Sequence, residues 1–195
     1  MKKAIIYDAA GADPRRDRIV RKDLTLVAVG DPAALAVVAA DLARDGAGLI
    51  ELCGAISPRW RPIVQAAVGP QVRVSSVTFG IESLAAAARF SQASIDGTPP
   101  PGAFIFIEAG ADPRVDRFAR SFPPQHTTFV AVPDETAAAA VARELTGRGV
   151  GLIELYGGFT GKGAAAVIDA VDGRAAVGIG SFTLDAIALP AIAAA

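Results

Sequence analysis

The chain contains 195 residues, of which 52% are hydrophobic and 20% are charged, and its formal net charge is -1. It is long enough to bury a sizeable core, and it lacks the basic surplus that binding to nucleic acids or anionic membranes requires. A single cysteine, Cys53, and a single histidine, His126, exclude an internal disulfide framework and a zinc site built from such residues. No apolar stretch reaches the roughly 18 residues needed to span a bilayer, so we expect a cytoplasmic protein.

In chain order, the sequence alternates strand-forming and helix-forming segments. The second half predicts strands at 103–109, 127–132, 151–157 and 175–182, and helices at 112–122, 134–149, 161–173 and 183–195. The first half shows the same order of segments. Four strand–helix units in each half predict parallel strands joined by right-handed crossovers.

The two halves are copies of one another. The segment Ala4–Arg21 (AIIYDAAGADPRRDRIVR) recurs as Ala103–Arg120 (AFIFIEAGADPRVDRFAR), and GLIEL at 48–52 recurs at 151–155. The second copy carries a four-residue insertion just before the strand at 127–132. This pattern is a tandem duplication over nearly the whole chain.

The duplication sets the expected domain organisation. Repeats 1–91 and 102–195 are joined by a stretch, 92–101, with the composition of a linker. Eight strand–helix units predict one small (β/α)8 barrel of the TIM type over residues 1–195, in which two (β/α)4 half-barrels close each other's open edges. Because about 24 residues per unit is short for a barrel that typically has about 250 residues, the alternative is two α/β sandwich domains with open four-stranded sheets.

The motifs of each copy also resemble a known family. The sequence GADPxxDR, an alanine-rich helix and then GLIELCG or GLIELYGGF are similar to bacterial proteins of roughly a hundred residues with no assigned function. The resemblance covers almost the whole chain, and GLIEL is its most specific part. It implies that single-copy relatives pair as two half-barrels, and it implies no activity. The first copy departs from the pattern after Gly54, where AISPRW replaces the glycine-rich turn.

Three glutamates are the candidate catalytic residues. Strand alternation directs Glu51 and Glu154 inward, so we expect them to face each other across the pseudo-two-fold axis, with Glu108 near them at the carboxyl rim. An ionised carboxylate in a packed interior needs a partner, and Arg73 is the one expected for Glu51. The glutamates would act as a general base with ancillary acids, or as ligands of Mg²⁺ or Mn²⁺. The alternative is a polar layer of the core without chemistry.

The glycine–lysine turn of the second repeat is the candidate anion-binding site. Turns after the seventh and eighth barrel strands often hold phosphate through backbone N–H groups. The residues expected to bind the ligand are Gly157, Gly158, Thr160, Gly161, Lys162, Gly163, Gly180 and Ser181, together with Arg73. The spacing does not match a P-loop, and the alternative is a βα turn with Thr160 as helix cap.

Three functions remain open from the sequence. The first is a lyase or isomerase that acts on a small phosphorylated or carboxylated metabolite. The second is a binding module without turnover, and the third is a bare scaffold. We expect no nucleic acid or membrane partner and a monomer or homodimer. His126 and a buried thiol at Cys53 are interpreted as structural.

Overall fold

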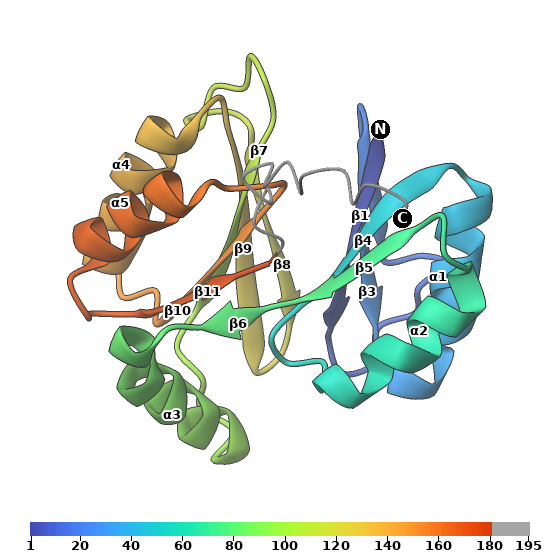
Figure 1. Ribbon diagram of the computed structural model, residues 1–195. Helices are drawn as coiled ribbons and strands as arrows, with labels where there is room; N and C mark the ends of the chain where they lie inside the picture. The colour runs from blue at the N-terminus through green and yellow to red at the C-terminus, as the bar shows by residue number, and fades with distance from the viewer. Residues whose placement is uncertain (181–195) are drawn as a thin grey trace, which may run out of the picture.

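The computed structural model describes residues 1–180 and contains two separate β-sheets (Figure 1). The first sheet has the strand order β2-β3-β1-β4-β5, and the second has the order β6-β11-β10-β7-β9-β8. The predicted last helix at 183–195 and the candidate residue Ser181 lie outside the described residues.

Each repeat contributes its elements in the same order. The first repeat contains β1 (Lys2–Asp8), β2 (Arg18–Arg21), β3 (Leu24–Val29), α1 (Leu35–Arg44), β4 (Ala47–Leu52), α2 (Arg61–Val68), β5 (Arg73–Ser76), β6 (Thr78–Phe79) and α3 (Ile81–Ile95). The second contains β7 (Gly102–Ile107), β8 (Arg117–Phe122), β9 (Gln125–Val132), α4 (Glu135–Gly147), β10 (Leu152–Tyr156), α5 (Gly161–Val171) and β11 (Ala176–Ile179). Helix α3 thus extends into the predicted linker at 92–101.

The closed barrel is not the observed fold. The predicted helix at 112–122 is a turn followed by strand β8, and β8 and β2 each pair antiparallel with the strand that follows. Phe118 stacks on Phe129 of β9 with 5.0 Å between ring centroids, so cross-strand packing outweighs the helical pattern of this segment. An antiparallel hairpin at the edge of each sheet is incompatible with eight parallel strands in a cylinder. The two α/β halves instead fit the alternative, with five and six strands in place of four.

The molecule has four layers. Helices α1 and α2 cover the outer face of the first sheet, α4 and α5 cover that of the second, and the two inner faces pack on each other (Figure 1). An aromatic cluster fills this interface: Tyr7 lies 5.7 Å from Phe104 and 5.3 Å from Phe129, and Phe104 lies 5.2 Å from Tyr156, between ring centroids. The repeats therefore share a hydrophobic core.

The strands of the two sheets run in opposite directions. Lys3, at the start of β1, donates from Nζ to the carbonyl of Gly157, just after β10, at 2.9 Å. Gln125, at the start of β9, donates from Nε2 to the carbonyl of Asp8, at the end of β1, at 3.1 Å. The carboxyl ends of the two sheets consequently lie at opposite ends of the interface. The single carboxyl face on which the sequence analysis places the site is not formed.

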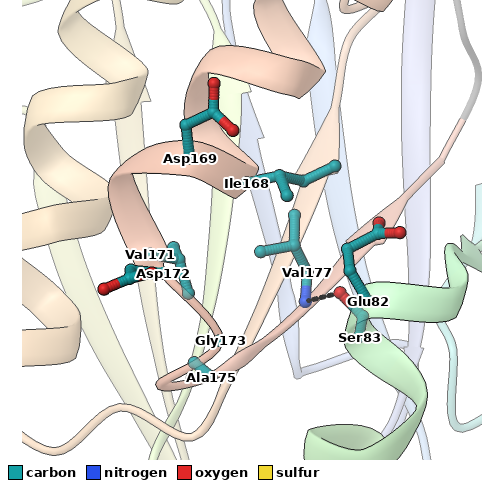
Figure 2. Close-up of a pocket in the computed structure, with 9 residues that line it drawn as sticks. All are labelled: Glu82, Ser83, Ile168, Asp169, Val171, Asp172, Gly173, Ala175 and Val177. Carbon is teal, nitrogen blue, oxygen red and sulfur yellow. Dashed lines mark hydrogen bonds between the residues drawn. The ribbon is translucent and has the colours of Figure 1, made fainter.

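The first repeat also completes the second sheet. Strand β6 leaves the first repeat and pairs antiparallel with β11. Ser83, in the first turn of α3, accepts a hydrogen bond at Oγ from the backbone N–H of Val177 at 3.1 Å (Figure 2). This buried hydroxyl satisfies an N–H group of β11 beside the β6 pairing. The two repeats are therefore interlocked through backbone hydrogen bonds.

Candidate functional site

A cavity of about 230 Å³ lies between the two repeats. Apolar rings, including those of Phe104 and Phe122, form part of its wall. Its polar lining comes from both repeats and consists of Asp8, Cys53, Ser94, Gln125, His126, Thr127 and Glu154. An apolar wall with a few convergent polar groups is typical of a small-molecule site.

Glu154 is the buried carboxyl group of this cavity. It lies in the middle of β10 and is 1% exposed. Its Oε1 accepts from the backbone N–H of Gly54 at 3.0 Å, and its Oε2 accepts from the hydroxyl of Tyr156. Burial raises the pKa of Glu154 to about 7, although these two hydrogen bonds lower it. Both protonation states are therefore accessible near neutral pH, as a general acid or base requires.

Glu51 makes the reciprocal contact. Its Oε2 accepts from the backbone N–H of Gly157 at 3.1 Å, and Gly157 occupies the position in the second repeat that Gly54 occupies in the first. Each glutamate thus accepts from the turn that follows the other repeat's strand, across the pseudo-two-fold axis. This contact joins the sheets through buried hydrogen bonds, as the polar-layer alternative requires. Of the two glutamates, only Glu154 lines the cavity.

The surroundings of the two glutamates differ at the residue two places after each of them. Cys53 follows Glu51, and its Sγ accepts from the backbone N–H of Asp8 at 3.4 Å. Burial and the nearby charge of Glu154 raise the pKa of the Cys53 thiol to about 12, so it is not a thiolate nucleophile at neutral pH. The equivalent residue is Tyr156, whose ring is fully buried. The small thiol of Cys53 forms part of the cavity wall, whereas Tyr156 is packed in the core and does not line the cavity.

Glu108 lies apart from the other two glutamates. It forms ion pairs with Arg21, the last residue of β2, at 3.0 Å and with Lys22, in the turn that joins β2 to β3, at 3.2 Å. The hydrogen bond from Arg21, followed by that from Lys22, lowers the pKa of Glu108 despite its burial. Arg21 also pairs with Asp116 at 2.8 Å. This cluster joins the hairpin of the first repeat to the end of β7, and Glu108 does not line the cavity.

The glycine–lysine turn already holds a carboxylate of the chain. Thr160 is the N-cap of α5 and accepts from the N–H of Gly163 at 3.1 Å. The N–H and hydroxyl of Thr160 donate to Glu135, at the start of α4, at 2.5 and 2.9 Å. A Cβ added at Gly163 would lie 2.0 Å from the Glu135 carboxyl carbon, so glycine is needed for this approach. Glu135 therefore occupies the position that an anion would take at this turn.

The remaining candidates surround this turn or lie away from it. Gly157 and Gly158 have φ angles of 90° and 92°, which glycine adopts without strain. Gly180 donates from its N–H to the carbonyl of Leu155 at 2.9 Å. Gly161 and Lys162 are exposed. Arg73 is also exposed, and its register partner on β4 is Leu49, so it does not supply a buried counter-charge to Glu51.

Of the polar lining residues, only Glu154 belongs to the predicted site, and those outside it are Asp8, Cys53, Ser94, Gln125, His126 and Thr127. Asp8 is half-buried, and burial raises its pKa. His126 lies at the start of β9, with its Nδ1 3.0 Å from the hydroxyl of Ser121. The signal that points to this region is the four-residue insertion of the second repeat. The inserted stretch brings Gln125 to the cavity.

Residues 1–180 contain neither a metal-binding cluster nor a membrane-spanning helix. Within this part of the chain, no three or more His, Cys, Asp or Glu side chains are placed to hold a metal ion. The helices described there are all too short or too polar to cross a bilayer.

Comparison with protein families identifies the repeats. One family model, described as a family of unknown function (DUF6506), matches residues 1–92 and again residues 102–189. The chain belongs to this family. The two matches confirm the tandem duplication of a family without an assigned function. Membership of DUF6506 therefore identifies the repeated unit and assigns no reaction to it.

Comparison with individual proteins adds little. No curated protein matches the chain. Among solved structures, it is similar to a carbohydrate transporter from Acidothermus cellulolyticus 11B in complex with myo-inositol, at 15% identity over 91% of this chain and 73% of that one. The TM-score of 0.29 is too low to establish a common fold.

Proposed function

We propose that this DUF6506 protein binds a small, uncharged polar molecule in the cavity between its repeats. The observation that carries the proposal is Glu154, a buried carboxyl group with a pKa of about 7 in the wall of an amphipathic cavity. The volume of about 230 Å³ lies below the roughly 300 to 1,000 Å³ of sites for drug-sized ligands, so the ligand is small.

The lining favours a neutral ligand over the anion expected from the sequence. Its ionisable groups are Asp8, Cys53, His126 and Glu154, and no lysine or arginine is among them. A phosphate or carboxylate there would meet two acidic groups without a counter-charge. Gln125 and Thr127 offer hydrogen-bonding groups to hydroxyl or amide functions, and Phe104 offers an apolar surface.

A thermal-shift screen of small polyols and amides tests the proposal. Cys53→Leu should fill part of the cavity and reduce the ligand-induced rise in Tm, because the added carbon atoms enter the space beside Glu154. Cys53→Ala is the matched control, since it leaves the space open. The proposal fails if no compound stabilises the wild type, or if Cys53→Leu is stabilised as strongly as Cys53→Ala.

Proton transfer to the ligand is the second candidate function. The pKa of about 7 suits Glu154 to the general base of an isomerase or lyase, with Tyr156 as its hydrogen-bond donor. Glu154→Gln keeps the shape of the side chain and removes the base. If the protein is an enzyme, this variant should retain ligand binding and lose turnover by about a hundredfold or more. Undiminished turnover would exclude Glu154 as the base.

A further inference from the structure

A separate pocket of about 350 Å³ lies beside helix α3. It is bounded by α3, by the turn between α4 and β10, and by the turn before β11. Its lining includes Ala86, Arg89, Phe90, Ala93, Val150 and Arg174. Phe90 and Pro100 also line the cavity between the repeats, so the two spaces share part of one wall.

Among residues 1–180, the charged side chains in this lining are two arginines. Arg174 donates from Nε to the carbonyl of Val171 at 2.9 Å and from Nη2 to that of Ala170 at 3.0 Å, at the end of α5. These bonds orient the guanidinium group of Arg174, which is an exposed residue. Within residues 1–180, Arg89 has no acidic partner within ion-pair distance. Both arginines are exposed, and a bound anion would interact favourably with the two positive charges that line the pocket.

The rest of the lining selects the kind of anion. Ala86, Ala93, Val150 and Phe90 present an apolar surface next to the two guanidinium groups. A small inorganic anion would leave this surface uncovered, whereas an organic carboxylate uses both parts of the pocket. We propose that this pocket binds a small organic carboxylate, with Arg89 and Arg174 holding the carboxylate and α3 packing against its apolar body.

A neighbouring pocket on α3 has the opposite charge. Glu82, Asp169 and Asp172 line a space of about 280 Å³ at the first turn of the helix (Figure 2). These carboxylates would repel the proposed ligand. The arginine pocket is therefore distinguished from its neighbour by charge as well as by its apolar lining.

Titration of the full chain with sodium benzoate, followed by calorimetry and by the NMR signals of the arginine Nε–H groups, tests the proposal. Benzoate should bind saturably, and Arg89→Ala should weaken binding about tenfold, the loss expected for one charge-assisted hydrogen bond. Arg174→Gln should have a similar effect. Since Arg174 also bonds to the end of α5, Arg89→Ala is the decisive variant if Arg174→Gln unfolds.

The controls test separately whether binding depends on the charge of the ligand, on the location of the arginine and on the apolar body of the ligand. Arg143→Ala removes an exposed arginine of α4 outside the pocket and should leave benzoate binding unchanged. Benzyl alcohol, which has the same ring without the charge, should bind at least about tenfold more weakly. Glu154→Gln should not affect benzoate binding, which distinguishes this pocket from the cavity between the repeats. The proposal is overturned if benzoate does not bind, if Arg89→Ala binds it like the wild type, or if inorganic phosphate binds as tightly.

Discussion

The two repeats place the same glutamate at the same point of the same strand, and its surroundings differ. Glu51 and Glu154 each accept from a glycine N–H of the opposite repeat. Two residues later, the first repeat has Cys53 and the second has Tyr156. The tyrosine donates to Glu154, and the thiol lines the cavity beside it.

This difference gives the two sides of the interface unlike surroundings, although the two glutamates are related by the pseudo-two-fold axis. The bonds from Gly54 and Gly157 to the glutamates follow the two-fold axis, because both copies retain the glycine and the glutamate. The cavity depends on side chains and on the insertion before β9, which the copies do not share. Duplication thus conserves the scaffold while one side diverges, and four predictions test this asymmetry.

The largest expected effect is the pH dependence that Glu154 imposes. Its pKa rises from 4.5 to about 7 on folding, so between these values the folded protein holds a proton that the unfolded chain has released. Stability should therefore fall by about 3 kcal/mol as pH rises from 4.5 to 7, and then level off. Glu154→Gln should lack this part of the slope in urea denaturation at pH 5 and pH 8. Identical slopes in both proteins would contradict the shift.

The second effect concerns the hairpins at the ends of the interface. Arg21→Met should destabilise the protein by about 2 kcal/mol at pH 7, because Glu108 is 8% exposed and loses its main partner. The lowered pKa of Glu108 means that this contribution exists above its unfolded pKa and is lost as pH falls through the folded value. Denaturant titration measures both.

The equivalent arginine of the second repeat is the control. Arg120 is exposed and lies over the ring of Phe118, 5.6 Å from its centroid. Arg120→Met should cost at most about 1 kcal/mol. Equal losses in both variants would show that the hairpins contribute symmetrically.

Tyr156→Phe should raise the pKa of Glu154 further, by about one unit or 1.4 kcal/mol, because it removes a hydrogen bond to the ionised form. The titration of the Glu154 side-chain carboxyl carbon by NMR measures the change. Tyr7→Phe, at another buried tyrosine of the interface, should leave that titration unchanged. A lower or unaltered Glu154 pKa in Tyr156→Phe would disprove the role of the hydroxyl.

The smallest effect separates the two turns. Thr160→Ala should cost about 1 kcal/mol, because it removes the side-chain cap of α5. The equivalent residue, Ser57, makes no capping hydrogen bond from its side chain, so Ser57→Ala should change stability by less than about 0.5 kcal/mol. Thermal unfolding of the two variants in parallel measures the difference, and equal losses of stability would contradict the prediction.

The sequence by itself determined the features that depend on local pattern. The duplication, the strands that contain GLIEL, the helix at 134–149 and the inward direction of Glu51 and Glu154 all follow from repetition and from periods of 2 or 3.6 residues. The resemblance to a family without assigned function rested on the same motifs, and the family match confirms it.

Tertiary structure decided how the copies meet. The segment 117–122 forms a strand because Phe118 gains a stacking partner on β9. This partner is distant from the local sequence pattern, so local propensity could not predict the strand. The sheets pack face to face with opposite strand directions, since contacts between the repeats, such as those of Lys3 and Gln125, set their orientation. The cavity lining follows from that orientation, because residues distant in sequence meet only once the sheets are packed.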